Sequence, residues 1–157
     1  LAGERPDGSL VLLGVETKLT DSFSQKPYDG EAYRRWMRGP RSPWRGDAWS
    51  EVATPRHNQL WRNHLLAIAA RDLPGSRYAQ VRSVVVLHPG DEDGAQVVAS
   101  YQRLLEPGDD TFVAFTLDHV VRAFTRGANA DEARWLDDLR RRYLALELSE
   151  DAWRARR

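Results

Sequence analysis

The chain has 157 residues, 41% of them hydrophobic, so it is long enough for one globular domain with a substantial core. Its 23 Lys and Arg residues balance its 23 Asp and Glu residues, so the net charge gives no support for nucleic-acid binding. It has no cysteine, which excludes disulfides, thiolate metal sites and cysteine nucleophiles. No apolar run is long enough to span a membrane, and we expect a cytoplasmic protein.

The first elements predicted are a turn and a buried strand. Residues 6–9 (PDGS) predict a tight turn, because Pro, Asp and Gly favour turn conformations. Residues 9–19 then predict a strand of aliphatic and β-branched residues. Both faces of this strand begin apolar, which is typical of a strand buried in an α/β layer. Alternation along the strand puts Glu16 and Lys18 on one face, where the apolar run ends.

Residues 20–54 predict a long irregular excursion with a short helix near 30–37, and such excursions in compact domains are usually functional or mobile. The excursion carries aromatic residues among its arginines, namely Tyr28, Tyr33, Trp36, Trp44 and Trp49. Two interpretations are open: these rings pack onto the domain, or the loop faces nucleic acid, with arginines on phosphates and rings on bases. We favour the second, and the candidate phosphate-binding residues are Arg34, Arg35, Arg41 and Arg45.

The rest of the chain alternates helices and strands. Thr54 as N-cap and Pro55 at the first helical position predict the start of a helix that ends at residues 73–75 (LPG). Strands are predicted at 82–89 and 110–117, and helices at 93–105, 117–127 and 131–148. This order predicts a single α/β layered domain with a mixed sheet over residues 1–148, followed by a polar tail at 149–157.

Glu16 and Lys18 are the candidate reactive pair. The chain has two lysines, Lys18 and Lys26, against 21 arginines, so a lysine at the end of this strand needs an explanation. A hard cation such as Mg²⁺ binds a few carboxylate oxygens, keeps several waters and lowers the pKa of a bound water. A neighbouring ammonium can orient that water or offset charge in a phosphodiester transition state. The pair therefore suits metal-dependent phosphodiester hydrolysis.

The segment PDGSLVLLGVETKL resembles the second half of the PD-(D/E)XK nuclease signature, in which a hairpin leads into a hydrophobic strand that ends in Glu-x-Lys. The match is Glu16, Thr17 and Lys18. The later helix NQLWRNHLLA resembles the Gln- and Arg-bearing helix that follows the core motif in a group of restriction-endonuclease-like proteins. The resemblance covers most of the chain. It implies an α/β restriction-endonuclease-like layered fold, with a central mixed β-sheet flanked by helices.

By this resemblance, Glu16 would be a catalytic metal ligand, Lys18 the catalytic lysine and the carbonyl of Thr17 a further ligand. Gln59 would be a catalytic residue near them, and Arg62 and Asn63 would lie near the active site or the DNA phosphates. The implied activity is that of a Mg²⁺- or Mn²⁺-dependent endodeoxyribonuclease. DNA would be the partner, and a homodimer is one expected form, because enzymes that cut both strands often dimerise.

The family's first acidic ligand is an Asp that normally lies at or near the start of the preceding strand. Asp7 is the visible candidate, but it stands in a turn where Asp is the expected residue for conformational reasons. We therefore keep Asp7 as a candidate metal ligand and favour an Asp upstream of Leu1, with the N-terminal part of the domain missing from this chain.

Two alternatives remain open. The first is a nuclease-like fold that no longer cuts and serves as a DNA-binding or protein-interaction module, because a fold alone does not give activity. The second is a small-molecule enzyme, which predicts a closed apolar pocket over residues 14–18. The histidines show no ligand spacing and are expected to be structural or on the surface, namely His57, His64, His88 and His119.

Overall fold

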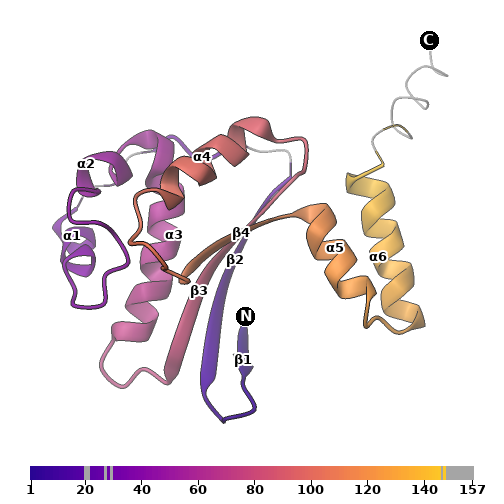
Figure 1. The fold of residues 1–157 in the computed structure, drawn as a ribbon, viewed down its shortest axis with the longest axis horizontal. Helices are drawn as coiled ribbons and strands as arrows, with labels where there is room; N and C mark the ends of the chain where they lie inside the picture. The colour runs from indigo at the N-terminus through magenta and orange to yellow at the C-terminus, as the bar shows by residue number, and fades with distance from the viewer. Residues whose placement is uncertain (20–21, 27, 29, 146, 148–157) are drawn as a thin grey trace.

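The computed structural model describes residues 1–19, 22–26, 28, 30–145 and 147. The elements in chain order are β1 (Ala2–Glu4), β2 (Leu10–Lys18), α1 (Glu31–Met37), α2 (Trp49–Val52), α3 (Pro55–Asp72), β3 (Tyr78–Leu87), α4 (Glu92–Gln102), β4 (Phe112–Thr116), α5 (Leu117–Thr125) and α6 (Ala130–Tyr143). The predicted α/β fold, a mixed sheet flanked by helices, is confirmed (Figure 1). The predicted tail at 149–157 lies outside the described residues.

The four strands form one sheet in the order β1-β2-β3-β4. β1 is antiparallel to β2, whereas β2, β3 and β4 are mutually parallel. Parallel neighbours need long crossover connections, and helices supply them here between β2 and β3 and between β3 and β4. The three parallel strands end at the same edge of the sheet, which brings Lys18 opposite Leu87 and Leu87 opposite Thr116. We call this the carboxyl edge.

The turn between β1 and β2 lies at the opposite end of β2 from the carboxyl edge. Asp7 accepts hydrogen bonds there from the backbone nitrogen of Ser9 at 2.9 Å and from its hydroxyl at 2.6 Å. Gly8 has φ 79°, a conformation that an L-residue with a Cβ adopts only with strain. Asp7 and Gly8 therefore stabilise the turn, Asp7 through its hydrogen bonds and Gly8 through its backbone conformation.

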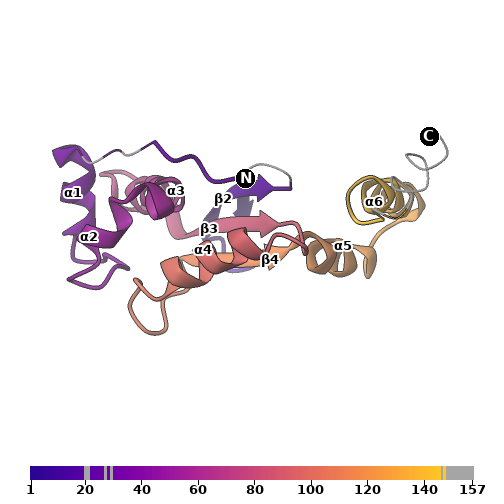
Figure 2. The ribbon, with the colours of Figure 1, turned by 90° about the horizontal axis from the view of Figure 1, so that it is seen from above.

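One face of the sheet is covered by α3 and α4 around the main hydrophobic core. Val81, Ser83, Val85 and Leu87 alternate along β3 with more exposed residues and face this core. Figures 1 and 2 show α3 between the sheet and the short helices α1 and α2, which therefore form an outer layer on this side. The aromatic rings of that outer layer and of α3 pack together, with Trp49 edge-on to Trp61.

A chain of hydrogen bonds crosses this core. The indole nitrogen of Trp44 donates to the hydroxyl of Tyr101 at 2.9 Å, and that hydroxyl lies 3.0 Å from Nδ1 of His64. Nε2 of His64 lies 2.7 Å from the hydroxyl of Thr111, which donates to Asp109. Because the Thr111 hydroxyl gives its proton to Asp109, it accepts from Nε2, so the proton of the neutral ring is on Nε2 and Nδ1 accepts from Tyr101. Burial lowers the pKa of His64 to about 3.

The other face of the sheet is covered near the carboxyl edge by the hairpin of α5 and α6. Val86 of β3, Leu117 and Val121 of α5, and Leu136 of α6 form a second, smaller core. Figure 1 shows this hairpin standing beyond the end of β4, on the side away from α3 and α4. Each helix in the described part of the chain is too short or too polar to cross a membrane.

Candidate active site

Four polar side chains meet near the carboxyl edge, at the end of β2. Glu16 and Lys18 come from β2, and Gln59 and Asn63 come from α3. Nε2 of Gln59 donates to Oε1 of Glu16, and Nδ2 of Asn63 donates to Oε2. Nζ of Lys18 lies 3.3 Å from Oε1 of Glu16. We call Glu16, Lys18, Gln59 and Asn63 the Glu16 cluster.

Local geometry explains why these residues meet. Glu16 and Lys18 are two residues apart in a strand, so their side chains leave the same face, the one that α3 covers. Gln59 and Asn63 are four residues apart in a helix and lie one above the other. The crossing of α3 over β2 then aims both amide groups at one carboxylate. The predicted placement of Glu16 and Lys18 on one strand face is confirmed.

The cluster is largely closed to solvent. The side chain of Lys18 is 11% exposed and that of Glu16 is 17% exposed. Hydrogen bonds to an ionised group in such surroundings are stronger than those between neutral groups. A carboxylate has about four acceptor positions, and Gln59, Lys18 and Asn63 use three of them. Among the described residues, one acceptor position on Oε2 has no donor, and it could accept a cation.

The segment that follows β2 supports the cluster from the other side. Nζ of Lys18 donates to the carbonyl of Ser22 at 3.4 Å and lies 5.5 Å from the ring centroid of Phe23. Phe23 is 5% exposed and belongs to the main core. Oε1 of Gln59 accepts from the backbone nitrogen of Ser24, so both ends of the Gln59 amide are fixed. No sequence signal pointed to Ser22, Phe23 or Ser24.

Within the described residues, the outer edge of β2 has no strand paired to it beside the cluster. Leu1 and Leu13 exchange backbone hydrogen bonds, whereas the carbonyl of Lys18 accepts from His88, on the β3 side, at 3.0 Å. Backbone groups alternate in direction along a strand, so Thr17 has the same orientation as Leu13 and its carbonyl points to the outer edge. Within the described residues no strand pairs with Thr17 on that side. The role of this carbonyl as a metal ligand stays a prediction.

Asp7 cannot share a metal ion with Glu16, and its prediction as a ligand is wrong. The turn that holds Asp7 precedes Leu10, and six residues of strand at about 3.3 Å each separate Leu10 from Glu16 by roughly 20 Å. The hydrogen bonds from Ser9 lower the pKa of Asp7, as expected for a carboxylate that closes a turn. The described residues contain no group of three His, Cys, Asp or Glu side chains suited to a metal ion.

The two remaining α3 candidates have different surroundings. Asn63, expected near the active site or the DNA phosphates, donates its amide to Glu16, and its contact with DNA stays a prediction. The guanidinium carbon of Arg62 lies 3.9 Å from the ring centroid of Tyr28, whose carbonyl accepts from Asn58. Arg62 precedes Asn63 in α3 and is partly exposed.

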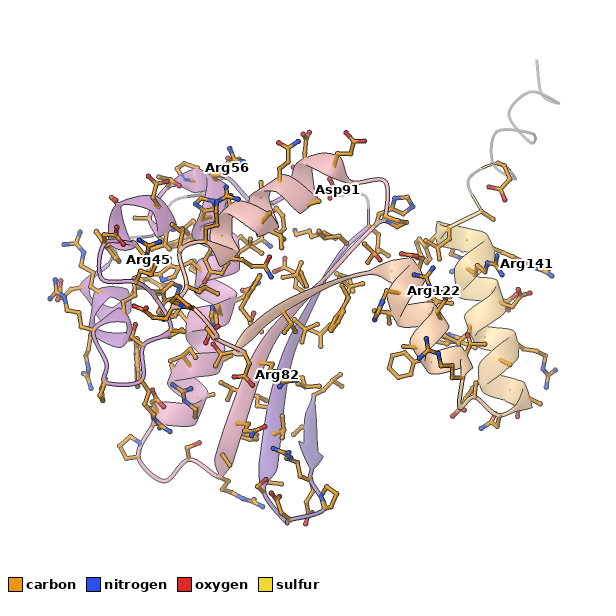
Figure 3. The ribbon with its side chains drawn as sticks, viewed as in Figure 1. Arg45, Arg56, Arg82, Asp91, Arg122 and Arg141 are labelled. Carbon is orange, nitrogen blue, oxygen red and sulfur yellow. The ribbon has the colours of Figure 1, made fainter. Side chains whose placement is uncertain are left out.

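The structure does not bring the arginines of the 34–45 segment to the Glu16 cluster. Arg34 stacks on Trp49 at 4.4 Å, Arg41 pairs with Asp72, and Arg35 and Arg45 are exposed. Figure 3 shows Arg45 on the same side of the sheet as α1, away from Asp91 at the carboxyl edge. Their contact with DNA stays a prediction. The aromatic residues of this segment favour the packing interpretation, and Trp44 is 4% exposed.

The pocket beside the cluster is not the closed one that a small-molecule enzyme would need. A groove of about 400 Å³ is lined by Gly14, Val15 and Glu16 of β2 and by Asn63 and Leu66 of α3, among others. Val15 is 45% exposed and Leu66 is 64% exposed. The groove therefore opens to solvent along the outer edge of β2.

The histidines lie as predicted, with three of them in structural contacts and His119 exposed on the surface. His57 bonds to Ser100 and to the carbonyl of Glu51, and His64 belongs to the buried chain described above. Nε2 of His88 donates to the carbonyl of Tyr143 at 2.9 Å and so ties α6 to the end of β3. His119 stacks on Phe115 at 5.4 Å.

Comparison with known proteins agrees with this architecture. Residues 1–145 match the family model described as the PD-(D/E)XK nuclease superfamily. No curated protein and no solved structure gave a match. The family match covers nearly the whole chain and includes both β2 and α3, which supply the Glu16 cluster. The chain belongs to the PD-(D/E)XK nuclease superfamily.

Proposed function

We propose that this protein is a Mg²⁺-dependent endodeoxyribonuclease that hydrolyses phosphodiester bonds at the Glu16 cluster. The observation that supports it best is the arrangement of Glu16 and Lys18. A carboxylate held by two amide donors faces an ammonium at 3.3 Å, at the end of a strand in a nuclease-superfamily fold. A carboxylate and an ammonium in one site can share the tasks of metal binding and charge stabilisation.

Each residue of the cluster has a distinct role in this proposal. Oε2 of Glu16 and the carbonyl of Thr17 would hold the metal ion, and both are hard oxygen donors of the kind that Mg²⁺ and Mn²⁺ prefer. The bound cation supplies an activated water and charge neutralisation at the phosphate. Lys18 orients the attacking water and offsets charge in the transition state. Gln59 and Asn63 fix the orientation of the Glu16 carboxylate, and Arg62 binds a phosphate of the DNA.

The proposal needs a second carboxylate at the metal, and the strand register supports one position for it. Ala2 lies opposite Leu12 and Glu4 lies opposite Leu10. If the same antiparallel register continued, the third residue before Leu1 would lie opposite Glu16 and on the same face. An Asp at that position would meet the Glu16 carboxylate beside the open edge.

Cleavage of plasmid DNA in Mg²⁺ tests the proposal. The assay compares two proteins, the chain itself and an extended form. The extended form has three more residues before Leu1, and the first of these is Asp. Each protein is also tested with Glu16→Gln and with Lys18→Ala. The proposal predicts nicking by the extended form that both substitutions abolish. A matched extension that begins with Asn controls for the added backbone. Cleavage that survives Lys18→Ala would contradict the mechanism.

An inactive nuclease-like module is the second candidate. It is favoured by one observation, that the described residues hold no cluster of three metal-binding side chains. It predicts that DNA or a protein partner binds equally well with and without Mg²⁺, and that Glu16→Gln leaves this binding unchanged.

A further inference from the structure

Two aromatic side chains are exposed side by side on the α5–α6 hairpin. Phe124 of α5 is 67% exposed and Trp135 of α6 is 62% exposed. Both line a shallow pocket of about 440 Å³, whose other walls include Ala128 and Leu136. Adjacent exposed aromatic residues of this size are common in protein interfaces and rare elsewhere on a surface.

α6 also carries its charges in two separate blocks. Within residues 130–138, four acidic residues and one arginine give a net charge of −3. Within residues 139–143, three arginines give a net charge of +3. The division suits the helix dipole, which favours acids at the start of a helix and bases at its end. It also makes the helix complementary to a second copy of itself that runs in the opposite direction.

The outward stripe of α6 has this self-complementarity residue by residue. Asp131, Trp135, Asp138 and Arg142 follow one another at intervals of four, three and four, so they form one stripe, and all four are exposed. Leu136, by contrast, is buried in the second core beneath α5. Within the described residues, the outward stripe thus lies on the side of α6 away from the second core, and Figure 1 shows α6 farther from the strands than α5.

A two-fold axis between Trp135 and Asp138 matches this stripe to itself. In an antiparallel pair, Asp131 lies opposite the partner's Arg142, and the symmetry repeats that ion pair at the other end. Trp135 then lies within one helical turn of the partner's Trp135, because their offset is three residues, or about 4.5 Å. Asp131 already pairs with Arg134 of its own helix, and its carboxylate has acceptor positions for both arginines.

We propose that α6 is a homodimer interface, in which it packs antiparallel against α6 of a second copy through Trp135 and two symmetric pairs of Asp131 with the partner's Arg142. Phe124 borders the same contact from α5. Figure 3 shows Arg122 and Arg141 on this hairpin, on the opposite side of the sheet from Arg45 and Arg56. The interface therefore leaves the α3 side of the molecule open. The inference does not depend on nuclease activity.

Light scattering during size-exclusion chromatography, over a wide range of protein concentration, tests the interface. The chain is expected to approach twice its monomer mass of 17.9 kDa as concentration rises. Asp131→Arg or Arg142→Asp alone should raise the dissociation constant by about tenfold or more, because each places like charges together at two points. The double variant Asp131→Arg/Arg142→Asp should restore the dimer, because it only reverses the two charges.

Arg141→Asp is the matched control, because Arg141 belongs to the same helix and pairs within it with Asp137, off the stripe. It should leave the dissociation constant nearly unchanged, and circular dichroism should show that all variants keep their helices. A wild-type chain that stays monomeric at every concentration would overturn the proposal. So would folded single variants that dimerise normally, or a folded double variant that is no better than the singles.

Discussion

Replacement of Asn63 by Leu isolates one of the two amide bonds that hold Glu16. Leu has nearly the shape of Asn but no donor, so the change removes the bond to Oε2 and little packing. The side chain of Glu16 is only 17% exposed, so water replaces the lost donor poorly. A hydrogen bond to a charged group contributes about 1.5–3 kcal/mol. We therefore expect Asn63→Leu to lower the free energy of unfolding at neutral pH by about that amount.

A double-mutant cycle shows whether this cost comes from Glu16. In a Glu16→Met background the carboxylate is gone, so Asn63→Leu should lower the free energy of unfolding by less than about 1 kcal/mol. The coupling energy between the two residues should then be about 1–2 kcal/mol. Equilibrium unfolding in urea, followed by tryptophan fluorescence, measures all four proteins. An equal cost of Asn63→Leu in both backgrounds would refute the argument that Asn63 acts on Glu16.

Three further predictions follow from the same structure. Lys18→Arg keeps the charge but enlarges an 11% exposed side chain packed against Phe23, so DNA cleavage by the extended form should fall at least tenfold; wild-type cleavage would contradict the proposed role. His64 has a pKa of about 3 in the folded chain, below the 6.5 of the unfolded chain, so its contribution to stability is complete above pH 6.5 and is lost as the pH falls toward 3. By linkage the free energy of unfolding should drop by about 2 kcal/mol between pH 7 and 5, and urea unfolding with no change over that range would count against it. Gly8→Ala should lower the free energy of unfolding by about 1–2 kcal/mol, because φ is 79° at this position. The control Gly3→Ala should lower it less in the same assay, because a Cβ at Gly3 meets no other atom.

The elements and the reactive strand follow from local patterns in the sequence. Alternation placed Glu16 and Lys18 together, and apolar spacing and helix signals predicted α3 and α4 to within a few residues of where they begin and end. β3 begins at Tyr78 rather than 82, because its polar first residues pair with the start of β2. Such pairing is a tertiary effect that propensity does not contain.

The partners of Glu16 could be predicted only in part. Helical spacing groups Gln59, Arg62 and Asn63 on neighbouring positions, but which of them meets Glu16 depends on how α3 is rotated over the sheet. Asn63 turned inward and Arg62 outward to Tyr28. The position of Asp7, by contrast, could be predicted from the sequence. Asp is favoured in turns, and in the structure Asp7 accepts hydrogen bonds from Ser9 in the turn.

The aromatic residues of the 34–49 segment could either bind nucleic acid or pack into the core. Tryptophan can stack on a nucleic-acid base, but it also has much apolar area to bury. Here the second effect prevails for Trp44, which is buried, and for Trp49, which packs on Trp61. Sequence alone does not decide between them, because both need the same residue in the same polar loop.

The central claim is that Glu16 binds a divalent metal ion with help from a second carboxylate at the outer edge of β2. Calorimetric titration with Mn²⁺ tests it most directly, with the chain extended by three residues that begin with Asp, the same extension that begins with Asn, and the Asp extension carrying Glu16→Gln. We expect saturable binding by the first protein, and binding at least tenfold weaker by the other two. Equal affinity in all three would contradict it.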